Sequence, residues 1–148
     1  MIRPFQADRL DALMSLWLTT TIEAHPFVDK SYWLESEALV RDVYLPDAET
    51  WIAEKDGALL GFISIMKRQF IGALFVTRAA QGYGVGSALI EKAKTLYPIL
   101  LLEVYKENAN AVGFYLKHGF NAVAEQPHPE TGQTTYVMRW HATHLSKR

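Results

Sequence analysis

The sequence contains no cysteine among its 148 residues. This absence excludes disulfide bonds, thiolate metal ligands and a cysteine nucleophile, and it is compatible with a reducing compartment. A chain of this length buries roughly 70% of its unfolded surface, so it needs no disulfide or metal to fold. We therefore expect one domain that spans residues 1–148.

Long apolar runs and an excess of one charge are also missing. No window reaches the roughly 18 apolar residues of a membrane span, and the N-terminus leads into an amphipathic segment instead of an apolar signal core. The 15 basic and 16 acidic side chains give a formal charge of -1, whereas nucleic-acid-binding proteins usually show a basic face. The sequence predicts a cytoplasmic protein without nucleic-acid or membrane partners, either a monomer or a homodimer.

The first 46 residues have helical periodicity. Asp8 is a suitable N-cap for a first helix, which His25 and Pro26 interrupt. The apolar residues of this helix recur at helical spacing: Leu10, Leu13, Met14, Trp17 and Leu18. A second helix is expected from Ser31 until Pro46 stops it. The apolar residues that we expect this helix to turn inward are Leu39, Val40 and Val43.

From residue 51 onward the pattern alternates between strands and helices. Asp56-Gly57 is a strong two-residue hairpin signal between two strand-like runs. Strands are expected at residues 51–55, 59–66, 70–76, 99–104, 120–126 and 134–140. Helices are expected at residues 85–96, before Pro98, and at residues 110–117, before Gly119.

The resulting element order is β-α-α-β-β-β-α-β-α-β-β. This order predicts an α+β protein, an α/β sandwich with helices on both faces of a mixed, mostly antiparallel sheet. The segment from residue 70 to residue 104 is a strand–helix–strand crossover, so its two strands should run parallel.

A glycine-rich turn joins the strand at residues 70–76 to the helix that follows. Its glycines can adopt positive φ angles and bring backbone N–H groups close to a ligand. The helix adds its unpaired N–H groups and the positive end of its dipole, and together these features make an anion site. The alternative is a tight loop that binds nothing.

The spacing in this turn excludes two kinds of nucleotide site. A dinucleotide site needs G-x-G-x-x-G and a later acidic residue, but the glycines here are Gly82, Gly84 and Gly86, and Glu103 lies within the next strand. A nucleoside triphosphate loop needs G-K-[ST], but Gly86 is followed by Ser87 and Ala88.

The spacing Q-x-x-G-x-G from Gln81 to Gly86 resembles the signature turn of the GNAT acetyltransferases. The pattern N-x-x-A-x-x-F-Y-x-x-x-G-F, from Asn108 to Phe120, is similar to the second cofactor segment of that family. Thr135-Tyr136-Val137-Met138 resembles its closing strand, so the resemblance covers nearly the whole chain. It implies a single GNAT domain with six or seven strands. Other segments resemble the small enterobacterial YiaC and YjaB group: His25-Pro26-Phe27, Tyr32-Trp33 and Leu102-Glu103-Val104-Tyr105.

The resemblance implies that acetyl-CoA is the acetyl donor and that no metal takes part. Backbone N–H groups of residues 82–87 would bind the pyrophosphate, and the backbone of Leu74 and Val76 would pair with the pantetheine arm. In the family the strands that carry Leu74 and Glu103 splay apart, and the arm fills the gap. The residues expected to bind the cofactor are Leu74, Phe75, Val76, Gln81, Gly82, Tyr83, Gly84, Val85, Gly86, Ser87, Asn108 and Tyr115. For Asn108, an N-cap role is the alternative.

Two side chains are expected to carry the chemistry. Tyr115 occupies the position of the family's general acid, although it could simply pack beside Phe114. A phenol protonates a thiolate only with local help, because reference pKa values oppose the transfer by about 2 kcal/mol. Glu103, a carboxylate on an apolar strand, is the expected general base for the charged amine. His25 and Glu23, on the loop between the first helices, are the alternatives.

The acceptor is less determined than the donor. The residues expected to contact it are His25, Phe27, Trp33 and Phe70. The leading hypothesis is direct attack by a protein lysine in a ternary complex. A small amine, a protein N-terminus, or a sensor that binds acetyl-CoA without turnover are the alternatives. The segment from His141 to His144 is expected to be a mobile basic tail and not a metal site.

Overall fold

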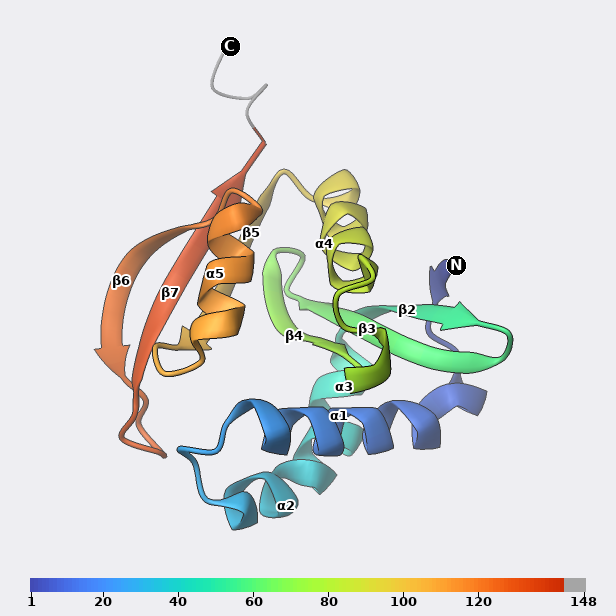
Figure 1. The fold of residues 1–148 in the computed structure, drawn as a ribbon, viewed down its shortest axis with the longest axis horizontal. Coiled ribbons are helices and arrows are strands. Elements are labelled where there is room, and N and C mark those ends of the chain that lie inside the picture. The colour runs from blue at the N-terminus through green and yellow to red at the C-terminus, as the bar shows by residue number, and fades with distance from the viewer. Residues whose placement is uncertain (143–148) are drawn as a thin grey trace.

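A seven-stranded sheet organises residues 1–142, which are the residues that the computed structural model describes (Figure 1). The strand order is β1-β2-β3-β4-β5-β7-β6, and only β4 and β5 run parallel. The strands are β1 (Ile2–Pro4), β2 (Glu49–Lys55), β3 (Ala58–Met66), β4 (Phe70–Val76), β5 (Ile99–Tyr105), β6 (Asn121–Pro127) and β7 (Thr134–His141). The predicted mixed, mostly antiparallel α+β fold and its element order are confirmed.

The helices cover both faces of the sheet, as expected (Figure 1). They are α1 (Leu10–Ala24), α2 (Lys30–Leu39), α3 (Leu45–Asp47), α4 (Val85–Leu96) and α5 (Ala109–Lys117). Alternate residues of β3 point to different helices, since Phe62 packs with Leu13 and Trp17 of α1 while Ile63 packs with Leu89 of α4. Because both faces of this strand are buried, its sequence is an almost continuous apolar run.

The helical first third of the chain differs from the prediction in how its helices begin and end and in which apolar residues they bury. Asp8 does not cap α1, because a 3-10 turn (Ala7–Arg9) precedes that helix and no side-chain cap bond forms. Asp29 instead caps α2 by accepting a hydrogen bond from the Ser31 N–H at 2.9 Å. Leu39 and Val43 are 45% and 47% exposed instead of inward.

A π-helical turn (Val40–Tyr44) explains why Val43 is exposed. Such a turn holds one residue more than an α-helical turn, so it rotates the residues that follow around the helix axis. As a result Leu45 is the residue buried against α1 and the sheet, and Val43 faces outward. The helix also passes through Pro46 and ends at Asp47.

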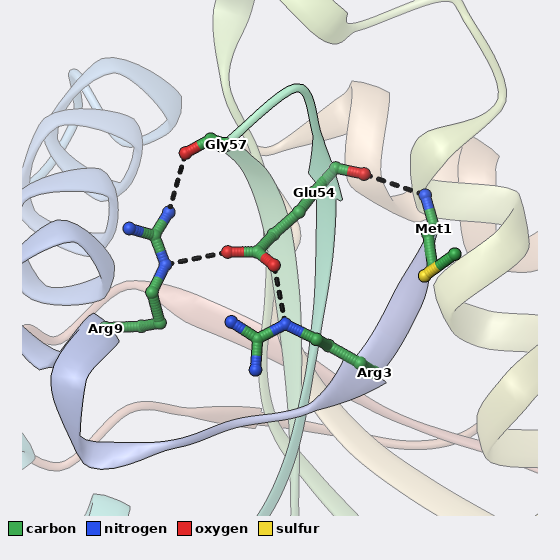
Figure 2. A network of polar contacts seen from close by, with 5 residues as sticks. All are labelled: Met1, Arg3, Arg9, Glu54 and Gly57. Atoms are coloured by element: carbon green, nitrogen blue, oxygen red, sulfur yellow. Dashed lines mark hydrogen bonds and ion pairs between the residues drawn. The ribbon is translucent and has the colours of Figure 1, made fainter.

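Beyond its antiparallel pairing with β2, the edge strand β1 is held by polar contacts centred on Glu54 (Figure 2). Arg3 Nε donates to Glu54 Oε1 at 2.6 Å, and Arg9 Nε lies 2.7 Å from Glu54 Oε2. The Met1 ammonium donates to the Glu54 carbonyl oxygen at 2.8 Å. The hydrogen bond from Arg3 is the main reason that the pKa of the Glu54 carboxyl is lowered. The N-terminus is thus fastened to the β2–β3 hairpin by charge.

An extra residue in β4 separates that strand from β5. Ser64 pairs with Ala73 and Ile65 with Ile71, so Gly72 is a bulge without a partner on β3. The parallel pairing of β4 with β5 stops at the same place, after Phe70 with Leu101 and Ile71 with Leu102. A bulge bends its strand and increases the local twist. From Gly72 to Val76 the edge of β4 that faces β5 therefore has no strand partner in the described chain, as the family resemblance implied.

Replacing Glu54 with glutamine should lower the melting temperature at pH 7. The folded pKa of Glu54 lies below its unfolded value, so its contribution is present above the unfolded pKa and is lost as pH falls through the folded pKa. The difference between wild type and Glu54→Gln should therefore shrink between about pH 5 and pH 3. Melting curves across this range test it. Glu35→Gln, at an exposed site on α2, is the control, and equal melting temperatures at pH 7 would contradict the role of Glu54.

Two glycine-to-alanine changes should have opposite effects on the free energy of unfolding. Gly57 has φ +80 in the hairpin turn, so Gly57→Ala should cost about 1 kcal/mol through backbone strain alone. Gly113 lies inside α5 with open space around it, so Gly113→Ala should stabilise by roughly 0.5 to 1 kcal/mol. Urea titrations of both variants measure the difference. A change of the same sign in both would contradict the backbone explanation.

Candidate active site

Three adjoining hollows follow the gap between β4 and β5. The inner hollow, about 190 Å³, lies against His25, Trp33 and Glu103. The middle hollow, about 370 Å³, lies against Glu23, Arg78 and Asn110. The turn hollow, about 420 Å³, lies against the glycine turn and Lys117. The inner and middle hollows share Leu74, Phe75, Asn108, Ala111 and Tyr115, and the middle and turn hollows share Val76, Gln81, Gly86 and Phe114. They form one continuous cleft.

The glycine turn presents backbone N–H groups to the turn hollow. Gly82 and Gly84 have φ +87 and +83, and Gly84 is the N-cap of α4. The Ala88 N–H donates to the Gly84 carbonyl oxygen at 3.0 Å, which leaves the N–H groups of residues 85–87 without acceptors inside the helix. Gly86 serves a different purpose, since a Cβ there would lie 3.4 Å from the Phe114 ring. The Phe114 ring of α5 thus lies directly beside the first turn of α4.

Gln81 and Tyr83, two other side chains of the turn, differ in their contacts with the rest of the chain. Gln81 Nε2 donates to the Val76 carbonyl oxygen at 3.1 Å, which ties the turn back to the end of β4. Tyr83 is exposed and lines none of the three hollows.

Two cations that line the cleft were not among the predicted site residues. Arg78 borders the middle hollow and lies 3.6 Å from Glu23. Lys117 borders the turn hollow. The available signal was their spacing, because Arg78 precedes Gln81 by three residues and Lys117 follows Phe114 by three on the same helix. Glu23 itself belongs to the last turn of α1 and not to the following loop, which corrects its expected place.

Tyr115 stands between the inner and middle hollows. It is 8% exposed, and its ring packs edge-on against Phe114 and Phe120. No described residue forms a hydrogen bond with its hydroxyl group, and burial raises the pKa of the phenol. Tyr115 therefore keeps its proton at neutral pH, and its side chain borders both hollows. Tyr115 therefore packs beside Phe114 and lines the cleft at the same time, so the two alternatives do not exclude each other.

Asn108 has a structural role that the sequence left open. Its Oδ1 accepts a hydrogen bond from the Ala111 N–H at 3.3 Å, so it is the N-cap of α5. The residue also lines the inner and middle hollows. With its oxygen used in the cap, the side-chain amide nitrogen is the group left to donate into the cleft.

Glu103 is exposed on the face of β5 that is turned toward α1 and α2, and it lines the inner hollow. Thr135 Oγ1 donates to Glu103 Oε2 at 2.8 Å, and Gln126 Nε2 donates to the same oxygen at 3.2 Å. These two contacts from β7 and β6 hold the carboxylate in place, while Oε1 makes no described hydrogen bond.

His25 forms the wall of the inner hollow opposite Glu103. The side chain is 7% exposed, and its Nδ1 lies 2.6 Å from the Thr21 carbonyl oxygen. Because a carbonyl can only accept, Nδ1 carries the proton, and Nε2 is the acceptor. Burial lowers the pKa of His25, so the ring is neutral at pH 7. The ring stacks with Trp33, whose centroid is 5.0 Å away.

Of the other three predicted acceptor residues, Trp33 lines the inner hollow, whereas Phe27 and Phe70 do not. The Trp33 Nε1–H is buried and makes no hydrogen bond with the described residues. The Phe27 ring packs against the rings of His25 and Tyr105, with centroids 5.6 and 5.5 Å apart, but it does not line the inner hollow. Phe70 is paired with Leu101 where β4 and β5 are still joined, and it lines none of the three hollows.

A contact between distant segments lies on the outer side of the aromatic rings of His25, Trp33 and Tyr105. The residues that form this contact were not among the predicted site residues. Tyr32 Oη donates to Glu130 Oε1 at 2.8 Å, joining α2 to the β6–β7 loop. His128 of that loop stacks on Tyr105 at 5.5 Å. Burial raises the pKa of Tyr32.

Other kinds of site have little support in residues 1–142. These residues contain no group of three or more histidine, cysteine, aspartate or glutamate side chains that could hold a metal ion. Of the His141–His144 segment, Thr143 and His144 lie outside the described residues. None of the helices in residues 1–142 has the length and apolar character needed to span a membrane.

Comparisons with known proteins identify the family. The description "Acetyltransferase (GNAT) domain" matches residues 24–142. The chain is 43% identical over 140 residues to the peptidyl-lysine N-acetyltransferase YiaC of Escherichia coli K12, covering 95% of this chain and 96% of that protein. It is 34% identical to YjaB of the same organism, covering 89% of each. The solution structure of apo YjaB from Escherichia coli superposes with a TM-score of 0.82 at 29% identity, covering 97% of this chain and 98% of YjaB. The chain therefore belongs to the GNAT family of acetyl-CoA-dependent N-acetyltransferases.

Proposed function

We propose that this enzyme transfers the acetyl group of acetyl-CoA to the ε-amino group of a protein lysine. The observation that carries the proposal is the continuous cleft, which has backbone N–H donors at one end, Tyr115 in the middle and Glu103 at the other end. The 43% identity to a peptidyl-lysine N-acetyltransferase supports the choice of lysine over other amines.

The donor fits the cleft with its pyrophosphate at the glycine turn. The free N–H groups of residues 85–87 and the Lys117 ammonium, at the positive end of α4, favour a dianionic group there. The pantetheine arm carries amide groups, and it would pair with the unpartnered edge of β4 from Gly72 to Val76 as an added strand does. Asn108 would donate its amide nitrogen to this arm. The thioester then lies beside Tyr115.

The transfer needs one bond to form and one to break. The lone pair of the lysine nitrogen attacks the thioester carbonyl carbon, the C–S bond breaks, and the sulfur leaves as a thiolate. Tyr115 would give this thiolate its phenolic proton. Burial raises the pKa of the phenol, but the same dry surroundings also raise the proton affinity of the thiolate. The two effects oppose one another, so the mismatch of about 2 kcal/mol between the reference pKa values has to be overcome by how the cleft positions the two groups.

The acceptor amine must also lose a proton, because a lysine with a pKa of about 10.4 is charged at neutral pH. Glu103 is the proposed base, since its carboxylate is held by Thr135 and borders the inner hollow. A water molecule between amine and carboxylate would carry the proton. His25 is the weaker alternative, because burial lowers its pKa and its Nδ1–H is already bonded to Thr21.

The aromatic side of the inner hollow suits a lysine side chain. His25 and Trp33 present flat apolar surfaces to the methylene groups, with Phe27 packed behind them. Trp33 can also attract the cation through its ring. Phe70 has no part in this acceptor site, because it lies away from the hollow.

Thiol release distinguishes the proposed acceptor from the alternatives. Purified enzyme, acetyl-CoA and a panel of lysine peptides, peptides with a free N-terminus and small amines should release free CoA fastest with lysine peptides. Faster release of CoA with N-terminal or small amines would show that one of these amines, and not lysine, is the acceptor. Binding of acetyl-CoA without release on any acceptor would support the sensor alternative.

The cytoplasmic location and the choice between monomer and homodimer stay predictions.

Replacing Tyr115 with phenylalanine should lower kcat at least about tenfold, with little change in the KM for acetyl-CoA, because only proton donation is lost. Since burial raises the pKa of Tyr115, wild-type turnover should not decline below about pH 9 through loss of that proton. Tyr97→Phe, at the C-terminal end of α4, is the matched control. An unchanged kcat in Tyr115→Phe would remove the tyrosine from the reaction.

Glu103→Gln should reduce turnover more at pH 7 than at pH 9, because more of the acceptor amine is already neutral at the higher pH. Initial rates at saturating acetyl-CoA across this range measure the effect. Glu125→Gln is the control, since Glu125 lies on β6 and pairs with Lys106 at 3.5 Å, outside the three hollows. A pH profile parallel to that of the wild type would exclude Glu103 as the base.

A further inference from the structure

A chain of three polar side chains leads away from the turn hollow. Ser87 lines the hollow, and its Oγ lies 3.0 Å from His118 Nε2. On the other side of the ring, His118 Nδ1 lies 3.5 Å from Glu91 Oε2. The histidine does not itself border the hollow. Any effect of His118 on a ligand there must therefore pass through the Ser87 hydroxyl.

The His118 ring is held firmly in this position. The Phe114 ring packs on it with centroids 4.5 Å apart, and its side chain is only 14% exposed. Lys94 Nζ donates to the His118 carbonyl oxygen at 2.7 Å and also lies 3.2 Å from Glu91 Oε2. The charged groups around the ring are thus Glu91 and Lys94 of α4 and Lys117 of α5. The ring cannot turn away without breaking these contacts.

The proton count of His118 decides what Ser87 can offer to an anion. In a neutral ring the proton stands on Nδ1, because the other tautomer would turn the Nδ1 lone pair toward the Glu91 carboxylate 3.5 Å away, and Nε2 then keeps a lone pair. The Ser87 hydroxyl must then donate to His118, and it turns its own lone pairs toward the hollow. A protonated ring donates from both nitrogens, so Nε2–H donates to Ser87 Oγ and the hydroxyl hydrogen becomes free to point into the hollow.

We propose that His118 is the positioning residue of the Ser87 hydroxyl at the pyrophosphate site and that it takes up a proton when the cofactor binds. The inference rests on the proposed function, because it needs the pyrophosphate to occupy the turn hollow. A dianionic phosphate favours the donating hydroxyl and thereby the protonated ring. Histidine is the side chain that can change its charge near neutral pH, so a histidine at this position can couple anion binding to proton uptake.

Calorimetric titration of the full-length protein with CoA tests the proton uptake without any mutation. At one pH near 7, the heat of binding should differ between PIPES and Tris, because the two buffers release protons with different enthalpies. Affinity for CoA should also weaken as pH rises from 6 to 8. Equal heats in the two buffers would overturn the proposal. Failure of the wild type to bind CoA would instead overturn the proposed function, so the two failures are distinguishable.

Two substitutions of His118 separate the effect of its hydrogen bond to Ser87 from the effect of the proton that it takes up. In His118→Gln the amide nitrogen can replace Nε2–H as a donor to Ser87, so affinity for CoA should stay within about twofold while proton uptake disappears. His118→Phe and Ser87→Ala should each weaken binding roughly fivefold to tenfold. His141→Gln, at an exposed site on β7, is the control and should retain both. Affinity in His118→Phe equal to that of the wild type would overturn the role of His118.

Dephospho-CoA identifies which phosphate is involved. It keeps the pyrophosphate but lacks the phosphate on the ribose, so wild-type proton uptake should be the same as with CoA. Loss of proton uptake with dephospho-CoA would place the coupled group at the ribose phosphate and overturn the assignment to the pyrophosphate.

Discussion

The site depends on a single extra residue in β4. Because Gly72 has no partner on β3, the strand bends there and its pairing with β5 ends after two residue pairs. The backbone groups of β4 beyond that point are left free, and the neighbouring strand carries Glu103 away from them. A regular ladder between β4 and β5 would fill this space with backbone hydrogen bonds. The cleft, its walls and the free strand edge all follow from the interruption of that ladder.

The second requirement is the close approach of α5 to α4, which closes the cleft from one side. The Phe114 ring of α5 packs beside Gly86 of α4, where a Cβ would lie 3.4 Å from the ring. The same contact brings Tyr115 to the junction of two hollows and His118 to Ser87. Residues of α5 therefore support the fold and line the site at once, as the capping bond of Asn108 also shows.

Sequence reasoning succeeded where a local interaction decides the structure. The hairpin at Asp56-Gly57 and the positive φ angles of Gly82 and Gly84 follow from the conformational freedom of short segments. It failed in the helical first third, where the π-helical turn after Leu39 shifts the buried positions. Periodicity assumes a constant number of residues per turn, so it placed Val43 inside where Leu45 is buried instead.

By itself the sequence determined the order of the elements, the glycine turn and the family motifs, because these depend on residues close together in the chain. The tertiary structure decided which side chains share the cleft. It placed Phe70 away from the three hollows, exposed Glu103 to the inner hollow, and joined Ser87 to His118 across 31 residues. Such contacts depend on how the strands diverge and how the helices pack over them. No local pattern records that geometry.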